Sequence, residues 1–126
     1  MTRNALNWFE IPVADIERAQ RFYETLLAKS LRREQAGPQT LAIFPYELGQ
    51  GVGGMLKQDA AAPASGANAT LVYLDASPSL DAVLSRAGEL GARVLQPKME
   101  LPNGNGFTAH IADTEGNRIG LHAMAA

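Results

Sequence analysis

With 126 residues and a mass of 13.4 kDa, the chain has room for one domain with a buried core. A hydrophobic fraction of 46% and a charged fraction of 19% exclude a disordered segment. The net charge of -2 and the scattered basic residues argue against nucleic-acid binding, which needs a basic stripe to neutralise phosphates. The sequence lacks cysteine, which excludes disulfides and thiolate zinc sites and suits a reducing compartment. Because the sequence also has neither a membrane-length apolar run nor a signal-peptide pattern, we expect a cytoplasmic protein without a membrane partner.

The first half of the chain has the pattern of a strand, a helix and three further strands. Apolar residues alternate with other residues over 7–13, which predicts a strand. Asp15 is a suitable N-cap, and apolar residues spaced three and four apart predict a helix over 16–27 with one face against a sheet. Glycine- and proline-rich loops separate the three further strand candidates, which are 30–34, 40–44 and 52–57.

The same pattern starts again after a stretch of small residues at 59–68, which we interpret as a linker. A strand is predicted at 69–74, and a helix at 78–90 with Ser77 as its N-cap, Pro78 at its first position and Gly91 as its stop. The remaining strand candidates are 93–96, 107–112 and 118–123.

The two halves therefore predict an α+β fold made of two βαβββ modules in a single domain. Module one covers about residues 5–58, the linker covers 59–68, and module two covers about 69–124. Each module leaves one sheet face uncovered by its helix. Bringing these faces together gives a curved mixed sheet around a cleft, with the helices on the outer face, and such concave surfaces bind small molecules.

The segment at 11–23 (IPVADIERAQRFY) and the segment at 113–121 (DTEGNRIGL) resemble the vicinal oxygen chelate superfamily of glyoxalases, bleomycin-resistance proteins and extradiol dioxygenases. The resemblance covers nearly the whole chain. It implies paired βαβββ modules, a homodimer and a pocket inside the sheet. In the enzymes of this superfamily, His and Glu from the first and last strands of the modules hold a divalent metal ion in that pocket.

This metal pattern is missing from the sequence. The ligand positions match Trp8, Ala69 and Gly120, with the fourth near Gly54, and alanine and glycine offer no side-chain donor while tryptophan is a poor ligand. We therefore expect no metal cofactor. The alternative is a displaced divalent-metal site built from Glu10, His110 and His122, a set of two histidines and one carboxylate.

Residue parity identifies which side chains face the cleft in module two. Odd-numbered residues of 107–112 and 118–123 are apolar and are expected under the helices, which leaves His110 and His122 on the other face. A turn centred on Gly116 would place these two imidazoles opposite each other. The alternatives are a half-buried His110 with a backbone partner and a solvent-exposed His122.

Three further residues are candidate ligand contacts. Glu10 shares a strand face with Trp8, and it could serve as a general base or simply pair with Arg118 or another cation. Trp8 could stack on a planar ligand or fill the space of the missing metal. Tyr73 is the best candidate for an aromatic wall, since it has the same strand parity as Ala69.

These residues support three hypotheses on function. The first is a metal-independent protein that binds a planar or aromatic small molecule, with Glu10, His110 and His122 as polar anchors. The second is a lyase, isomerase or dioxygenase of the glyoxalase-like kind, with the same three residues as its catalytic candidates around a displaced metal. The third is a partner-binding or stress-associated protein whose cleft is vestigial.

Overall fold

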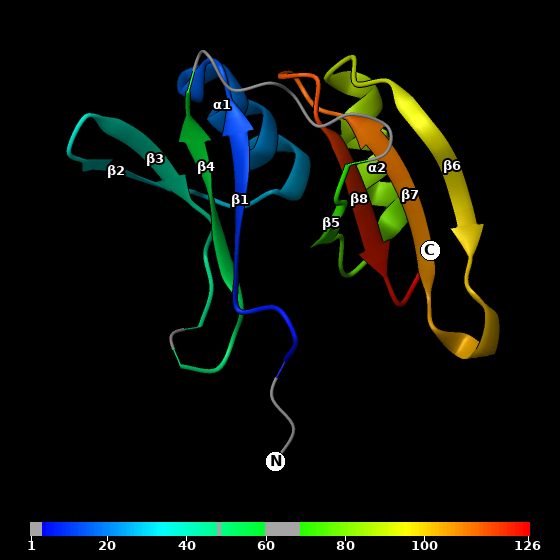
Figure 1. Ribbon diagram of the computed structural model, residues 1–126. Helices are drawn as coiled ribbons and strands as arrows, with labels where there is room; N and C mark the ends of the chain where they lie inside the picture. The colour runs from blue at the N-terminus through cyan, green and yellow to red at the C-terminus, as the bar shows by residue number, and fades with distance from the viewer. Residues whose placement is uncertain (1–3, 48, 60–68) are drawn as a thin grey trace.

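The computed structural model describes residues 4–47, 49–59 and 69–126, arranged as two four-stranded sheets with two α-helices (Figure 1). The predicted linker lies outside the described residues except for Asp59, whose N–H donates to the Val13 carbonyl at 2.8 Å. No helix in the described part of the chain is long and apolar enough to cross a membrane.

Module one contains the predicted strand, helix and three strands. Its sheet has the order β1-β4-β3-β2, with β1 parallel to β4 and the other neighbours antiparallel. Asp15 caps the helix as predicted, because its Oδ1 accepts from the Arg18 N–H at 3.2 Å. The elements are β1 (Trp8–Val13), α1 (Ile16–Leu27), β2 (Arg32–Ala36), β3 (Gln39–Ile43) and β4 (Gly53–Gln58).

Module two repeats this order, and its sheet runs β5-β8-β7-β6 with β5 parallel to β8. A short 3₁₀ turn at Pro102–Gly104, which the sequence pattern did not predict, joins β6 to β7. The elements are β5 (Val72–Asp75), α2 (Leu80–Glu89), β6 (Val94–Glu100), β7 (Phe107–Ala112) and β8 (Arg118–Ala123).

Three predicted elements in module two have wrong boundaries, one of them the strand predicted at 93–96, which continues to Glu100 as β6. The strand predicted at 69–74 begins at Val72 instead of residue 69, because pairing with β8 starts at Val72–Ile119. The helix cap is Ser79 and not Ser77: the Ser77 N–H is bonded to Asp75 Oδ1 at 2.9 Å within a turn, and Ser79 Oγ accepts from the Ala82 N–H at 3.2 Å.

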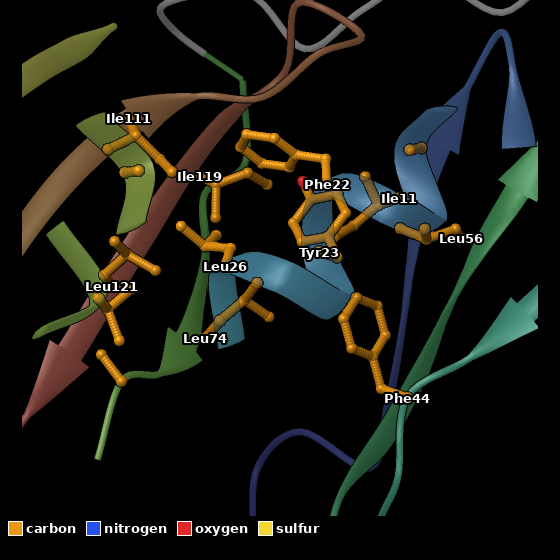
Figure 2. Packing of buried hydrophobic residues seen from close by; sticks show 14 of the residues in the cluster. Ile11, Phe22, Tyr23, Leu26, Phe44, Leu56, Leu74, Ile111, Ile119 and Leu121 are labelled. Atoms are coloured by element: carbon orange, nitrogen blue, oxygen red, sulfur yellow. The ribbon is translucent and has the colours of Figure 1, made fainter. Parts of the chain in front are cut away.

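A single core joins both modules. Figure 2 shows Phe22, Tyr23 and Leu26 of α1 between side chains of the second sheet on one side and side chains of the first sheet on the other. All three helix residues are buried, as are Phe44, which follows β3, and the strand residues that surround them (Ile11, Leu56, Leu74, Ile111, Ile119 and Leu121). The predicted α+β class with two βαβββ modules is confirmed, and the two sheets do not close into a barrel.

Polar contacts reinforce the junction between the modules. Glu115, in the β7–β8 turn, accepts two hydrogen bonds from Arg18 at 2.7 and 2.9 Å and further ones from the N–H groups of Ala14 and Asp15. This guanidinium lowers the pKa of Glu115 to about 2. The buried Tyr23 hydroxyl donates to Asp113 Oδ2 at 2.6 Å, and burial raises the pKa of that tyrosine. Module one is thus fastened to the last hairpin of module two.

Candidate ligand site on the second sheet

The helix-free face of the second sheet carries the even-numbered residues of β7 and β8, as the sequence predicts. Odd-numbered residues such as Ala109, Ile111 and Leu121 are fully buried in the core. The predicted partner of His110 is wrong, however. The hairpin is centred on Glu115, so His110 pairs with Gly120, and His122 pairs with Thr108. The two imidazoles therefore share one face but lie on a diagonal.

Tyr73, His110 and Arg118 form a hydrogen-bonded chain on this face. The Tyr73 hydroxyl lies 2.8 Å from Nε2 of His110. The guanidinium of Arg118 approaches Nδ1 of the same ring, with Nε at 3.2 Å and a terminal nitrogen at 3.0 Å. The alternative prediction, a backbone partner for His110, is therefore wrong, because both ring nitrogens contact side chains.

Glycine at position 120 makes the placement of Tyr73 possible. Tyr73 on β5 is the register partner of Gly120 on β8, and its ring lies over that glycine. A Cβ atom added at Gly120 would lie 2.5 Å from Cδ1 of the tyrosine ring, closer than two non-bonded carbon atoms can approach. The ring thus occupies the space in which a side chain at position 120 would stand, and its hydroxyl reaches the next strand, β7.

The contacts of Arg118 with Nδ1 require a neutral His110 ring, because Nδ1 of a charged imidazolium has no lone pair with which to accept. His110 is 7% exposed, and burial together with the nearby Arg118 charge lowers its pKa. A neutral imidazole carries one ring hydrogen, so it can donate at one nitrogen and accept at the other.

A hollow of about 460 Å³ lies beside the hydrogen-bonded chain of Tyr73, His110 and Arg118. Tyr73 and Leu101 supply apolar surface, and Thr108 and His122 supply polar groups. His122 is half-buried and Nε2 is 2.7 Å from the Asn105 carbonyl, which fixes that nitrogen as a donor. The simple solvent-exposed reading of His122 is therefore wrong. Leu74 and Asp75 complete the lining.

Trp8 and Glu10 lie on the other sheet. Both occupy the helix-free face of β1, as predicted, but neither lines the large hollow. Trp8 packs edge-to-face on Tyr46, with ring centroids 5.6 Å apart, which agrees with a filling role. Glu10 is half exposed and pairs with Lys57 at 3.9 Å, which matches the simple ion-pair alternative with a cation other than Arg118. Glu10 also borders a smaller hollow of about 140 Å³ between the modules.

The predicted cluster of Glu10, His110 and His122 is therefore not assembled. Within residues 4–47, 49–59 and 69–126, no three His, Asp or Glu side chains lie close enough together to hold one ion. The arrangement does not suit a divalent cation, because the nitrogens of His110 already meet Arg118 and Tyr73, and an imidazole must offer a lone pair to a metal.

The strand registers define the fourth-strand metal-ligand position and correct the one assigned to Ala69. Equivalent buried pairs anchor the two sheets, namely Ile11–Leu56 in the first and Leu74–Leu121 in the second. Counting from these pairs, the counterpart of Gly120 is Met55, the residue after Gly54, and the counterpart of Trp8 is Leu71 and not Ala69. None of these side chains is an imidazole or a carboxylate, so the correction leaves the metal argument unchanged.

Four residues of this site were not among the predicted ligand contacts. Thr108, Asp75 and Leu101 line the hollow, and Arg118 orients His110. Thr108 and Arg118 share the even parity of His110, so the sequence held a signal for both. Leu101 carried no such signal, because its position depends on the turn after β6.

Comparison with known proteins places the fold in a family. The sequence model of the Glyoxalase/Bleomycin resistance protein/Dioxygenase superfamily matches residues 5–121. A mutant of glyoxalase I from Zea mays superposes with a TM-score of 0.70 at 23% identity over 94% of this chain and 46% of its own. The present chain thus spans about half the length of that enzyme.

Two solved structures of similar length also match. The genomically encoded fosfomycin resistance protein FosX from Listeria monocytogenes has a TM-score of 0.67 at 15% identity, covering 97% of this chain and 94% of its own. A glyoxylase/bleomycin resistance protein/dioxygenase domain from Frankia sp. EAN1pec has a TM-score of 0.71 at 17% identity, covering 97% and 93%. No curated protein sequence matches the chain. On the match over 5–121, the chain belongs to the Glyoxalase/Bleomycin resistance protein/Dioxygenase superfamily, the vicinal oxygen chelate group that its motifs resemble.

Proposed function

We propose that the protein binds a planar aromatic small molecule in the hollow on the second sheet, without a metal ion. The observation that carries this proposal is the hollow of about 460 Å³ with a tyrosine ring, leucine side chains and a few polar groups in its wall. Ligand pockets for small molecules have volumes of roughly 300–1,000 Å³ and this same mixture of apolar walls and sparse polar groups.

Metal independence is supported by the hydrogen bonds that the polar side chains of this face already make within the protein. His110 is bonded at both nitrogens, His122 donates to the Asn105 carbonyl, and the Tyr73 ring covers Gly120. Recruiting an ion would require breaking these contacts. Aromatic stacking and a few hydrogen bonds suffice for binding at micromolar strength.

The second candidate is a lyase, isomerase or oxygenase with a displaced divalent-metal site. One observation favours it: His110 and His122 lie on the same sheet face, with His122 two residues along β8 from Gly120, the partner of His110. Glu10 does not join them, so another carboxylate would have to complete the set. Asp75 is the candidate, because it is the register partner of His122.

Thermal-shift measurements separate the two candidates. We expect 2-naphthol to raise the Tm equally with and without EDTA, and Thr108→Phe, which fills the hollow, to abolish the rise. Zn²⁺, Ni²⁺, Mn²⁺ and Fe²⁺ should leave the Tm unchanged. A rise caused by one of these ions that disappears in both His110→Ala and His122→Ala would reject the first candidate in favour of the second.

We also propose that the protein forms a homodimer, as its superfamily resemblance implies. Exposed apolar side chains on the second sheet support this, since Tyr73 and Met99 are each 49% exposed. A second copy would cover them and close the open side of the hollow. Sedimentation equilibrium should give twice the monomer mass, and a monomer at tens of micromolar protein would contradict the proposal.

A further inference from the structure

Arg118 determines which nitrogen of His110 carries the ring hydrogen. A guanidinium group has donors only, so Nδ1, which lies 3.0–3.2 Å from two of its nitrogens, must accept. The single hydrogen of the neutral ring then resides on Nε2. That hydrogen is donated to the Tyr73 oxygen, 2.8 Å away.

The Tyr73 hydroxyl consequently keeps its own hydrogen for another partner. Within residues 4–47, 49–59 and 69–126, His110 is the hydrogen-bond partner found for this hydroxyl, and the side chain is half exposed on the wall of the hollow. Accepting a hydrogen bond polarises an O–H group and makes it a better donor. The hydrogen bonds from Arg118 to His110 and from His110 to Tyr73 thus leave the Tyr73 O–H group as a donor for a ligand.

We propose that Tyr73 selects the ligand of the hollow by donating its hydroxyl hydrogen to a carbonyl oxygen, with His110 and Arg118 as positioning residues; this inference rests on the proposed ligand-binding function. The ligand class is an aromatic ketone or a related aromatic carbonyl compound. An uncharged oxygen suits the site better than a carboxylate. The Asp75 side chain lines the hollow and would repel a negative charge, whereas the positive charge of Arg118 contacts His110 and does not line the hollow.

The test compares two probes of the same shape, acetophenone and ethylbenzene, which differ by the carbonyl oxygen. Dissociation constants are measured by ¹H–¹⁵N NMR titration, with the amide signals of Thr108 and His122 as reporters of the hollow. We expect Tyr73→Phe to lower the preference for acetophenone over ethylbenzene about 3- to 10-fold, the worth of one neutral hydrogen bond. The affinity for ethylbenzene should stay unchanged.

Tyr46→Phe is the matched control. Tyr46 is also a partly exposed tyrosine whose ring covers a glycine, Gly53, but it belongs to the connection between β3 and β4 and packs over the first sheet. Removing its hydroxyl should leave the preference between the two probes as it is in the wild type.

Two variants of His110 test its positioning role. In His110→Gln the amide oxygen can accept from Arg118 and the amide nitrogen can donate to Tyr73, so the preference for acetophenone should be retained. In His110→Leu neither bond can form and the Tyr73 hydroxyl is no longer positioned, so the preference should fall, by no more than in Tyr73→Phe, which removes the hydroxyl itself. A purely structural role would change the affinity for both probes by the same factor.

The outcomes distinguish this inference from the function on which it rests. If both probes bind and Tyr73→Phe leaves their ratio unchanged, the inference is wrong and the binding function stands. If neither probe gives a saturable shift at Thr108 or His122, the proposed function fails and the inference fails with it.

Discussion

The two sheets have the same strand order but different helix-free faces. On the first sheet, Trp8 and Tyr46 pack together over Gly53, and Glu10 pairs with Lys57. These groups satisfy one another. On the second sheet a hydrogen-bonded chain ends at Tyr73 beside a hollow of about 460 Å³.

The comparison separates what the fold requires from what a ligand requires. Both sheets place a tyrosine ring over a glycine, so this packing by itself does not make a binding site. What distinguishes the second sheet is the polar chain behind the ring and the open volume in front of it. The four predictions below test this contrast, beginning with the core that both sheets share.

Leu26→Ala is expected to have the largest effect, because this fully buried residue of α1 lies between the two sheets. Truncation of a buried leucine costs about 2–5 kcal/mol of unfolding free energy. Urea unfolding should show the loss as one transition, identical by Trp8 fluorescence and by NMR signals of module two. Separate transitions for the two modules would mean that they do not share a core. Leu6→Ala, at a 51% exposed position, is the control.

Acidification should weaken the junction between the modules. The pKa of Glu115 is about 2 in the folded protein against an ordinary 4.5, owing first to its hydrogen bonds with Arg18. A lowered carboxyl pKa stabilises the fold above the unfolded value and loses this contribution as pH falls from about 5 towards 2, up to about 3 kcal/mol. Urea titrations across this range should show that slope, and Glu115→Gln should reduce it. An equal slope in the variant would contradict the assignment.

The two ring-covered glycines allow a direct comparison of the sheets. Gly120→Ala should displace Tyr73 and reduce the preference for acetophenone about 3- to 10-fold, because the hydrogen bond to His110 is lost. Gly53→Ala should displace Tyr46 and leave ligand binding unchanged. Equal losses in both variants, measured by NMR titration, would remove the distinction between the sheets.

The smallest expected effect is on the pKa of His110 when the neighbouring charge of Arg118 is removed. Burial and then Arg118 lower the pKa of this histidine, so Arg118→Gln should move that pKa upward while burial keeps it below its ordinary 6.5. The measurement is an NMR titration of the imidazole Cε1–H signal. A lower pKa in the variant would show that Arg118 does not act on His110 as proposed.

Much of the fold could be predicted because it depends on local patterns. The alternation at Phe9, Ile11 and Val13 and the Asp15 cap appear in the structure as predicted. The boundary near Ser77 could not be predicted, since a second serine, Ser79, offers equal capping chemistry and the Asp75 side chain decides between them.

The sequence could predict which side chains of the site share a sheet face, but not which of them contact one another. Parity placed Tyr73, His110 and His122 on one face, whereas the partner of His110 depended on where the hairpin turns, and a shift of one residue in that centre changes the pairing. Trp8 and Glu10 were assigned to the same site because equivalent faces were assumed to meet. In the structure the large hollow is lined by residues of module two.

The most direct test of the central claim is a ¹H–¹⁵N NMR titration of the wild-type protein with 2-naphthol in the presence of EDTA. Metal-free binding on the second sheet predicts saturable shifts at Leu101, Thr108 and His122, with Glu10, Met55 and Lys57 unaffected. Shifts confined to the first sheet, or shifts that appear only after a divalent metal is added, would contradict the claim.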